Sequence, residues 1–478
     1  MKRALPIIFV CACSSPVTKL APIIDAPSGT SADPFVNLDE LEVSVAIAGA
    51  NDDLVAATFA RGAQVSLPGV PYEPNLVVHM TGRASGAEVA YGRTCAFDLV
   101  EGQPLPEPHL YLSRTVKWAA VDAAPVASRV GGSGWPAADG SGLYVAGLDG
   151  PAGAPVTQID RFDPRTATYE SFGGVVARVE PAVAPLGDGR IVIVGGRDPS
   201  SGAPLGSLDV IDPLASPALR VTSIKDDRAA RTGAAAVTQS DGRIALIGGR
   251  DGSGMLVTTV LEIRADAGAI ALREVHADLT TRRERATVTR LGDAVGAPIL
   301  VVGGIDDTGH TVATAELYKP LQEGYSPSKP TMIVARQRHA AVLAPDGSVL
   351  VVGGIDDTGA AVRTVELFSP DTGFAGVAQL PAAAGVVDFS LTSLPDGRFL
   401  LAGGRFSLGA PPLRAAFVLQ LDPLDGTVDV AATDDLPSER AGHAAAPLCD
   451  GTILVAGGEG LGAAVDPARY DPPSPGRR

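Results

Sequence analysis

The sequence predicts an all-β protein, in which a seven-bladed β-propeller follows a small β-sandwich domain and a lipoprotein signal peptide. Three features lead to this prediction: a unit that repeats about every 50 residues, many turn-forming residues, and a basic then apolar N-terminus. The 478 residues include 56 Gly and 39 Pro, a larger share than in an average soluble domain. This composition predicts short strands joined by many turns.

The N-terminal residues predict a signal peptide. Residues 1–12 begin with Met-Lys-Arg and continue as an apolar stretch too short to span a bilayer, as in a secretory signal peptide. Val-Cys-Ala-Cys, ending at Cys13, resembles the lipobox of bacterial lipoproteins, in which a small residue precedes the acylated Cys. The resemblance implies lipidation at Cys13, and Ser14 implies the outer membrane, facing either the periplasm or the cell surface. An ordinary cleaved signal is the alternative.

Two segments separate the signal from the repeats. Residues 13–37 are rich in Ser, Pro, Ala and Thr, which predicts a flexible tether. Residues 38–114 contain short apolar stretches separated by Gly and Pro, which predicts a small β-sandwich. Cys95 and Cys449 are the cysteines that follow Cys13. An oxidising compartment would allow a disulfide between them, but their wide separation favours unpaired thiols.

Residues 115–478 contain the repeat. Seven hexapeptides end in a Gly pair or its remnant, and their pairs begin at residues 146, 195, 248, 303, 353, 403 and 457. An Asp-Gly precedes the pair at a constant distance in six units, and an Arg precedes it in five. In the unit with the longer turn at residues 292–298, Arg282 is expected at the Arg position, and Val386 replaces the Arg in the sixth unit.

Each unit predicts four antiparallel strands. In residues 336–381, a short strand leads through Pro-Asp-Gly to a strand that is apolar on both faces, and two more strands follow the Gly pair. Four-stranded sheets stacked radially form a propeller. The repeat resembles the kelch family, whose best-known relative is the central propeller of galactose oxidase. The third-strand aromatic residue of that family is present in four units, but the usual fourth-strand Trp is missing.

The ends of the repeat predict how the ring closes. The last unit stops at Tyr470-Asp-Pro-Pro, which leaves no room for its fourth strand. Residues 115–121 are an extended apolar stretch before the first unit. We expect this stretch to complete the last blade and remove both open edges.

One face of the propeller is the candidate ligand face. The strand order brings the starts of the first strands and the second-to-third loops to this face. The candidate residues are Arg178, Arg231, Arg336 and Arg440 with Asp198, Asp251, Asp306 and Asp356. These residues could hold an anionic or sugar ligand over the central channel. The favoured interpretation is structural: the charges pair with each other or with the third-strand acids Asp160, Asp209, Glu316 and Glu366.

No motif predicts catalysis, and no metal or cofactor is expected. The two identical Asp-Asp-Thr-Gly loops at 306–309 and 356–359 could bind calcium, but solvated turns are favoured because the alternating ligands of a dedicated loop are missing. His339 and His443 share one repeat position, which is a packing position in the kelch family. The copper site of galactose oxidase is not expected, because Cys95 lies outside the propeller.

These features predict a non-catalytic binding platform for a protein or a glycan, carried by a membrane-anchored extracytoplasmic lipoprotein. The net charge of −16 argues against nucleic acid as a partner. The protein is expected to be a monomer that touches the membrane only through its N-terminal lipid. The alternative is a periplasmic carbohydrate-active enzyme, such as a mutarotase, that uses the Arg and Asp face. An enzyme would bring a few unrepeated polar residues together at the channel mouth.

Overall fold

The computed structural model describes residues 16–474, except for residues 28–30, 51, 61, 122, 124, 126, 152, 218, 219, 267 and 462–465. Cys13 and the signal peptide therefore lie outside the described residues. The described chain is all-β, with two short 3-10 helices, η2 (Asp227–Ala229) and η3 (Pro320–Gln322). No helix in this part of the chain is long and apolar enough to cross a membrane.

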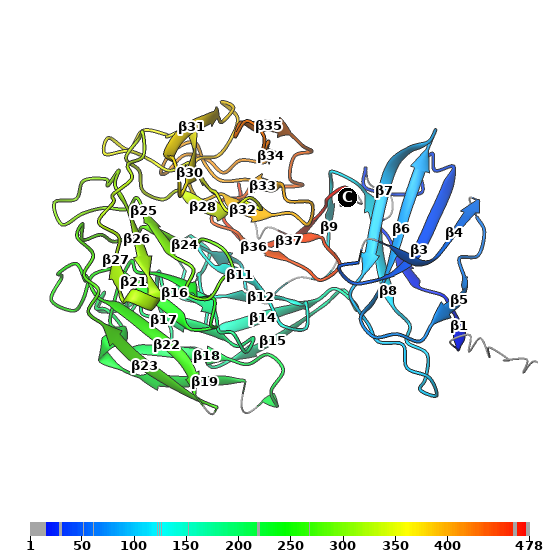
Figure 1. Cartoon of the computed structure of the whole chain (residues 1–478), viewed down its shortest axis with the longest axis horizontal. Coiled ribbons are helices and arrows are strands. Elements are labelled where there is room, and N and C mark those ends of the chain that lie inside the picture. Colours follow the sequence, from blue (N-terminus) through cyan, green and yellow to red (C-terminus); the bar gives the residue numbers. More distant parts are fainter. Residues whose placement is uncertain are drawn as a thin grey trace, which may run out of the picture.

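The larger part of the chain is a β-propeller (Figure 1). The described residues form seven four-stranded antiparallel sheets, which we call blades 1 to 7 in chain order. Blades 1 to 3 consist of β11 (Ser133–Pro136), β12 (Gly142–Val145), β14 (Gln158–Asp163) and β15 (Thr168–Gly173); β16 (Ala182–Pro185), β17 (Ile191–Val194), β18 (Ser207–Ile211) and β19 (Val221–Lys225); and β20 (Ala235–Thr238), β21 (Ile244–Ile247), β22 (Val260–Asp266) and β23 (Ala269–Val275). Blades 4 and 5 consist of β24 (Thr287–Arg290), β25 (Ile299–Val302), β26 (Ala315–Lys319) and β27 (Gly324–Tyr325); and β28 (Ala340–Leu343), β29 (Val349–Val352), β30 (Thr364–Ser369) and β31 (Gly373–Gln379). Blades 6 and 7 consist of β32 (Ser390–Ser393), β33 (Phe399–Ala402), β34 (Ala416–Leu421) and β35 (Val428–Ala432); and β36 (Ala444–Pro447), β37 (Ile453–Ala456), β38 (Ala468–Asp471) and β9 (Lys117–Ala120).

The second strand of every blade is buried along its whole length. Its side chains pack on both faces of the sheet, which explains why these hexapeptides are apolar at every position. Between blades 4 and 5, for example, Leu300 and Val302 share one core with Val349, Val351 and Phe368. The blades are therefore held together by apolar side chains between adjacent sheets.

The first strands lie on the inner side of the ring. Each is the edge strand of its sheet, and β16, β20, β24, β28, β32 and β36 contact one another in this order. β36 also contacts β11, which brings the last blade against the first. This arrangement places the starts of the first strands around a central channel. The two-stranded pair β10 (Arg129–Val130) and β13 (Leu148–Asp149) lies at the same end of blade 1.

The predicted closure of the ring is confirmed. β9 pairs with β38 as the fourth strand of blade 7, with Trp118 opposite Tyr470. The rings of these two residues lie 5.0 Å apart, and the Trp118 indole N–H donates to the Asp434 carbonyl over 3.0 Å. The N-terminal side of the propeller and its C-terminal end are thus joined in one sheet, which leaves no open edge there.

The N-terminal domain is built on a six-stranded sheet in the order β2-β8-β7-β6-β3-β4. Its strands are β2 (Ile23–Asp25), β3 (Glu40–Ile47), β4 (Asp53–Ala60), β6 (Leu76–Ala84), β7 (Ala87–Thr94) and β8 (His109–Arg114). The ribbon of β1 (Val17–Leu20) and β5 (Leu67–Pro71) packs on it, since Leu20, Leu67 and Val70 share one core with the β3 and β6 side chains. The second layer is therefore a two-stranded ribbon, which is smaller than the second sheet of the expected sandwich.

The expected flexible tether at residues 13–37 is wrong for much of its length. β1 pairs antiparallel with β5, and β2 pairs parallel with β8 at the edge of the six-stranded sheet. The small polar residues that suggested a linker flank two short apolar strands whose partners lie far along the chain. Such short strands gain stability only from that pairing, so local composition did not reveal them.

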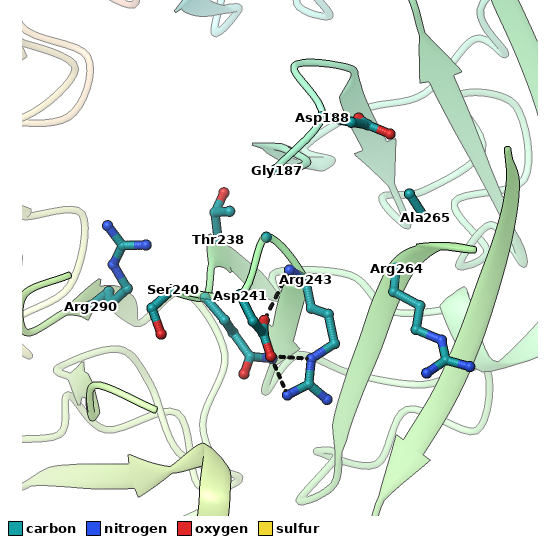
Figure 2. Close-up of a pocket in the computed structure, with 11 residues that line it drawn as sticks. Gly187, Asp188, Thr238, Ser240, Asp241, Arg243, Arg264, Ala265 and Arg290 are labelled. Carbon is teal, nitrogen blue, oxygen red and sulfur yellow. Dashed lines mark hydrogen bonds and ion pairs between the residues drawn. The ribbon is translucent and has the colours of Figure 1, made fainter. Parts of the chain in front are cut away.

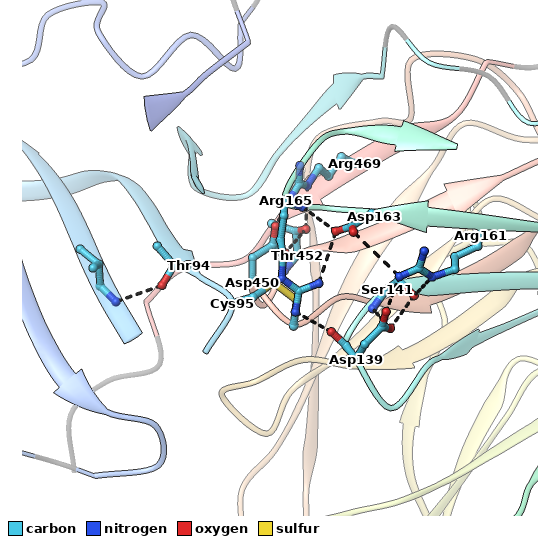
Figure 3. The surroundings of a disulfide bond; sticks show 12 residues. Thr94, Cys95, Asp139, Ser141, Arg161, Asp163, Arg165, Asp450, Thr452 and Arg469 are labelled. Carbon is cyan, nitrogen blue, oxygen red and sulfur yellow. Dashed lines mark hydrogen bonds and ion pairs between the residues drawn. A yellow bond between two sulfur atoms is a disulfide. The ribbon is translucent and has the colours of Figure 1, made fainter. Parts of the chain in front are cut away.

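The expectation of unpaired cysteines is also wrong. Cys95 and Cys449 form a disulfide, with their Cα atoms 4.9 Å apart (Figure 3). Cys95 directly follows β7, and Cys449 lies in the turn between β36 and β37. The bond therefore ties the N-terminal domain to the first-to-second strand turns of the propeller. Beside it, the buried Arg469 guanidinium lies 3.7 Å from the centroid of the Tyr111 ring of the N-terminal domain.

Candidate functional site

One face of the propeller carries the end of each second strand, the start of each first strand and the start of each third strand. Bridges between backbone segments join these three points, as at Val179 with Arg197 and Ala441 with Glu459. We call this the loop face, because the second-to-third loops cover it. Cys449 lies at the other end of β36 and β37, so the N-terminal domain is attached to the opposite face.

The arginines predicted for a ligand are buried inside the blades. Arg178, Arg231, Arg336 and Arg440 are all at most 3 % exposed. Arg336 donates to the carbonyls of Gly353 (3.1 Å) and Thr364 (2.8 Å) and forms an ion pair with Glu366. Each of these groups belongs to the same blade as the arginine. The guanidinium therefore links segments from three strands of one blade. These arginines have a structural role and do not form a ring around a ligand.

The same ion pair recurs in three more blades. Arg129 pairs with Asp160, Arg178 with Asp209 and Arg283 with Glu316, at 2.7 to 3.0 Å. In blade 4 the sequence pointed to Arg282, but Arg282 is exposed and Arg283 is 0 % exposed. The longer turn of that blade had shifted the alignment by one residue. A buried guanidinium is costly to leave without its partner, so the loss of either member of a pair would destabilise the blade.

Two of the buried arginines have a different set of partners. Arg231 donates to the Thr259 carbonyl over 2.7 Å, and Arg440 donates to the Asp466 carbonyl over 2.8 Å. Burial is the main cause that lowers the pKa of each guanidinium to about 10. Leu261 and Ala468 stand where blades 1, 2, 4 and 5 have their third-strand acid. These two positions are also inside the blade and are not available to a ligand.

The four predicted aspartates form turns in the exposed second-to-third loops. Asp306 Oδ1 accepts from the Thr308 backbone (2.9 Å), the Thr308 hydroxyl (2.7 Å) and the His310 backbone (3.0 Å). Asp356 accepts the equivalent set in the next loop, and Asp198 and Asp251 accept from serines in their own loops. These hydrogen bonds lower the pKa of each carboxyl. The structure does not bring the aspartates and the arginines together.

A different set of residues surrounds the channel on the loop face. The residue two positions after the repeated Arg has a left-handed backbone in every blade, with φ between 51° and 71°. These seven positions are Gly131, Glu180, Gly233, Arg285, Arg338, Asp388 and Gly442. Backbone hydrogen bonds of 2.7 Å link some of them around the ring, from Gly131 N–H to Gly442 O and from Arg285 N–H to Gly233 O. They therefore lie where neighbouring first strands meet at the channel.

Four of these positions carry charged side chains, and the conformation is unfavourable for them. A left-handed backbone costs a residue with a Cβ atom about 1 to 2 kcal/mol, whereas glycine adopts it freely. Glycine fills the position in three blades, so the fold itself does not require a side chain there. Strained residues of this kind concentrate at functional sites. The four side chains are Glu180, Arg285, Arg338 and Asp388, which we call the mouth residues.

The mouth residues form exposed ion pairs with one another and with the residue after the Gly pair. Glu180 lies 3.5 Å from Arg285 and 3.6 Å from Arg197. Asp388 lies 3.6 Å from Arg338 and 3.3 Å from Arg405. The mouth side chains are between 30 % and 43 % exposed. Exposed pairs contribute about 0 to 1 kcal/mol each, so a charged ligand could replace these contacts at little cost.

Two buried histidines lie next to the mouth. His339 Nε2 lies 2.9 Å from the Thr287 hydroxyl of the preceding blade, and His443 Nε2 lies 2.8 Å from the Ser390 hydroxyl. Burial, with a smaller contribution from the neighbouring repeated Arg, lowers the pKa of each imidazole to about 3. Both rings are therefore neutral and pack against the Gly pair of the preceding blade, which agrees with the packing role expected from the repeat.

The mouth residues were missed because the sequence was searched for features that recur in most blades. A position that differs between blades, instead of recurring in them, could have revealed these residues. Two residues after the repeated Arg, or after Val386 in the sixth unit, three units have Gly and four have Glu, Arg, Arg and Asp. A position that glycine occupies in some units, and charged residues in others, indicates a special backbone with a variable side chain.

No protein-family model matches the chain, and no curated protein matches it. Solved structures do. A novel fungal alcohol oxidase of the AA5 family, in complex with copper, has 18% identity and a TM-score of 0.53, over 75% of this chain and 76% of that chain. The structure of YjhT has 14% identity and a TM-score of 0.46, over 62% of this chain and 94% of that chain. The fold is a β-propeller of the galactose oxidase type.

The oxidase overturns the prediction that the chain is not an enzyme. That prediction rested on the lack of catalytic motifs in the sequence, but the same architecture, over three quarters of both chains, belongs to an oxidase. The architecture therefore accommodates catalysis. At 18% identity the likeness establishes the fold alone, and the reaction of the oxidase is not carried over to this chain.

The described residues do not fit a copper site. The described residues contain no group of three or more His, Cys, Asp or Glu side chains that could hold a metal ion. Cys95 and Cys449 are joined to each other, which removes both thiolates as ligands. His339 and His443 are buried beside hydroxyl groups of the neighbouring blade. No chemical step is therefore assigned to copper in this chain.

Proposed function

We propose that this chain is an extracytoplasmic lipoprotein whose seven-bladed, kelch-type propeller binds a protein or a glycan at the channel mouth on the loop face. The observation that carries the proposal is the set of four charged mouth residues held in a left-handed backbone. They are exposed, unrepeated and energetically unfavourable for the fold. A ligand with both charged and hydrogen-bonding groups would fit this mixed ring of carboxylates and guanidinium groups.

The position of the N-terminal domain supports an orientation of the propeller relative to the membrane. The acyl group at Cys13 would anchor the chain before β1, and the N-terminal domain is attached to the face opposite the mouth. A monomer anchored in this way in the outer membrane would point its loop face away from the bilayer. The net charge of −16 would add repulsion from anionic lipid headgroups. The mouth would thus be open to partners in the periplasm or at the cell surface.

A catalytic use of the same mouth is the second candidate. An enzyme is expected to bring a few unrepeated polar residues together at the channel mouth, and Glu180, Arg285, Arg338 and Asp388 have this property. A carbohydrate-active enzyme could bind its substrate there. Binding and turnover are therefore measured on the same variants.

The experiment replaces the mouth residues by the residue that other blades use. The variant Glu180→Gly, Arg285→Gly, Arg338→Gly and Asp388→Gly should fold as the parent does, because glycine is favourable at φ near 55°. Pull-down from the host membrane and a glycan array, each with a turnover assay on the captured sugar, should give a ligand with the parent and none with the variant. Equal binding by both proteins would refute the mouth as the site. Turnover by the parent alone would establish the enzyme.

A further inference from the structure

A cavity of about 500 Å³ lies on the face opposite the mouth, and Figure 2 shows residues that line it. It is formed by the first-to-second strand turns of blades 2 and 3, together with the ends of β22 and β24. Gly187 and Gly242 of the two turns are in contact, and Gly187 N–H donates to Gly242 O over 2.9 Å. The cavity is thus bounded by paired turns, and its size is typical of small-molecule sites.

Gln239 in the cavity wall departs from the repeat. Its backbone N–H closes the first-to-second strand turn, as the equivalent residue does in every blade. The other six blades have Ala or Leu at this position: Ala137, Leu186, Leu291, Ala344, Leu394 and Leu448. Gln239 is 3 % exposed. An amide has therefore replaced an apolar side chain in the one blade that contributes most of the cavity.

The orientation of this amide leaves a hydrogen-bond acceptor unused. Gln239 Nε2 donates to Glu262 Oε1 over 3.3 Å, and the opposite orientation would place two oxygens against each other. Gln239 Oε1 is buried and has no hydrogen-bond partner among the described residues. Buried acceptors are normally paired, and an unpaired one is costly. The carbonyl is therefore suited to a ligand that donates a hydrogen bond.

Three arginines line the same cavity, together with the acidic residues Asp188 and Asp241. In Figure 2, Arg264 and Arg290 lie on opposite sides of it, and Arg243 lies between them. Arg264 pairs with Asp266 at 3.2 Å and Arg290 pairs with Asp293, each through Nη2. A guanidinium has five N–H donors, so each of these pairs leaves further donors that suit the two oxygens of a carboxylate.

We propose that this cavity is a second ligand site, which binds a small polyhydroxylated carboxylate of the hexuronate class. The carboxylate would be held by Arg264, and a hydroxyl would donate to Gln239 Oε1. A mono- or disaccharide acid suits the cavity volume of about 500 Å³. The site lies at the opposite ends of the strands from the mouth, so the two sites are independent.

The test is isothermal titration calorimetry of the full chain with D-galacturonate and D-glucuronate. The methyl ester of each sugar, acetate and inorganic phosphate serve as comparison probes. We expect saturable binding of at least one hexuronate, and binding of its ester and of acetate that is at least tenfold weaker. Failure of both hexuronates to bind would overturn the proposal, as would phosphate binding as tightly as the hexuronate.

Three variants locate the binding. Arg264→Gln and Gln239→Leu should each weaken hexuronate binding at least tenfold. Gln239→Leu should fold as the parent does, because Leu fills the equivalent position in blades 2, 4, 6 and 7. Arg282→Gln removes an exposed arginine outside the cavity and should leave binding unchanged. Unchanged affinity in both cavity variants would overturn the site, and the four-glycine mouth variant should retain full affinity.

Discussion

Glu180 and Arg285 form an ion pair of 3.5 Å at the channel mouth, although they belong to blades 2 and 4. Blade 3 lies between them and contributes Gly233 at the equivalent position. A Cβ atom on Gly233 would approach Glu284 Oε2 to 3.1 Å, and its φ of 63° disfavours any other residue. The missing side chain in blade 3 thus leaves room for a contact between blades that are not neighbours.

The buried arginines are predicted to control stability. Arg336→Met would leave the Glu366 carboxylate buried without its partner, and the loss should be about 3 to 5 kcal/mol in the free energy of unfolding. Denaturant unfolding of the parent and the variant measures this loss. Arg282→Met changes an exposed arginine and should stay within about 0.5 kcal/mol. A similar small effect for Arg336→Met would contradict the structural role of the repeated Arg.

The interdomain disulfide is predicted to stabilise the chain under oxidising conditions. Cys95 and Cys449 are separated by 354 residues, so the bond restricts a long loop of the unfolded chain. Reduction, or the variant Cys95→Ser with Cys449→Ser, should lower the free energy of unfolding by about 2 to 4 kcal/mol. Thermal melting with and without a reductant measures the effect. The double Ser variant should not respond to the reductant, and a response would point to another target.

The two buried histidines predict loss of stability in mild acid. Their pKa values are about 3 in the folded chain, against about 6.5 when unfolded. The unfolded chain therefore binds more protons below pH 6.5, and stability should fall as the pH drops from 6.5 toward 3. His339→Phe with His443→Phe should weaken this dependence between pH 6.5 and 5, because Phe389 fills the same position in blade 6. Melting curves across this range give the slope, and an unchanged slope would assign it to other groups.

The closing strand is predicted to be essential for the propeller. Trp118 on β9 is 5 % exposed and packs against Tyr470, so Trp118→Ala should cost about 3 to 5 kcal/mol. Val116, which is 37 % exposed in the preceding turn, provides the control Val116→Gly. Its φ of 57° makes glycine favourable, so this variant should melt at or above the parent temperature. Equal melting of Trp118→Ala and the parent would show that the ring does not depend on β9.

The fold was largely predictable because each blade repeats the same pattern of strands and turns. Val349–Val352 is apolar at every position since a blade buries both faces of its second strand, and the sequence records this in all seven units. Residues 115–121 were assigned correctly to the last blade. This apolar stretch had no partner near it in the sequence, and the last blade lacked a fourth strand, so the two could be matched. The ribbon strand β1 was missed, because its partner β5 lies 50 residues away and its composition resembles a linker.

The candidate site was less predictable, because its residues are defined by departures from the repeat. Arg336 was expected at the right face, but the sequence could not decide between a ligand and Glu366 as its partner. Asp306 was expected on that face and lies there, within its own turn. Glu180 and Arg285 meet only because the ring brings blades 2 and 4 to one channel. The spacing of residues along the sequence therefore does not predict such a contact.

The sequence by itself determined the period, the all-β class, the four strands of each unit and the turn residues, because backbone propensity and strand burial act within one blade. Tertiary structure decided which charges are buried, which cysteines meet, and which residues line the mouth and the opposite cavity. Cys95 and Cys449 show the reason: 354 residues separate them, and only the closed ring and the docked N-terminal domain bring their Cα atoms to 4.9 Å. Contacts between blades depend on the geometry of the whole ring, which local sequence does not encode.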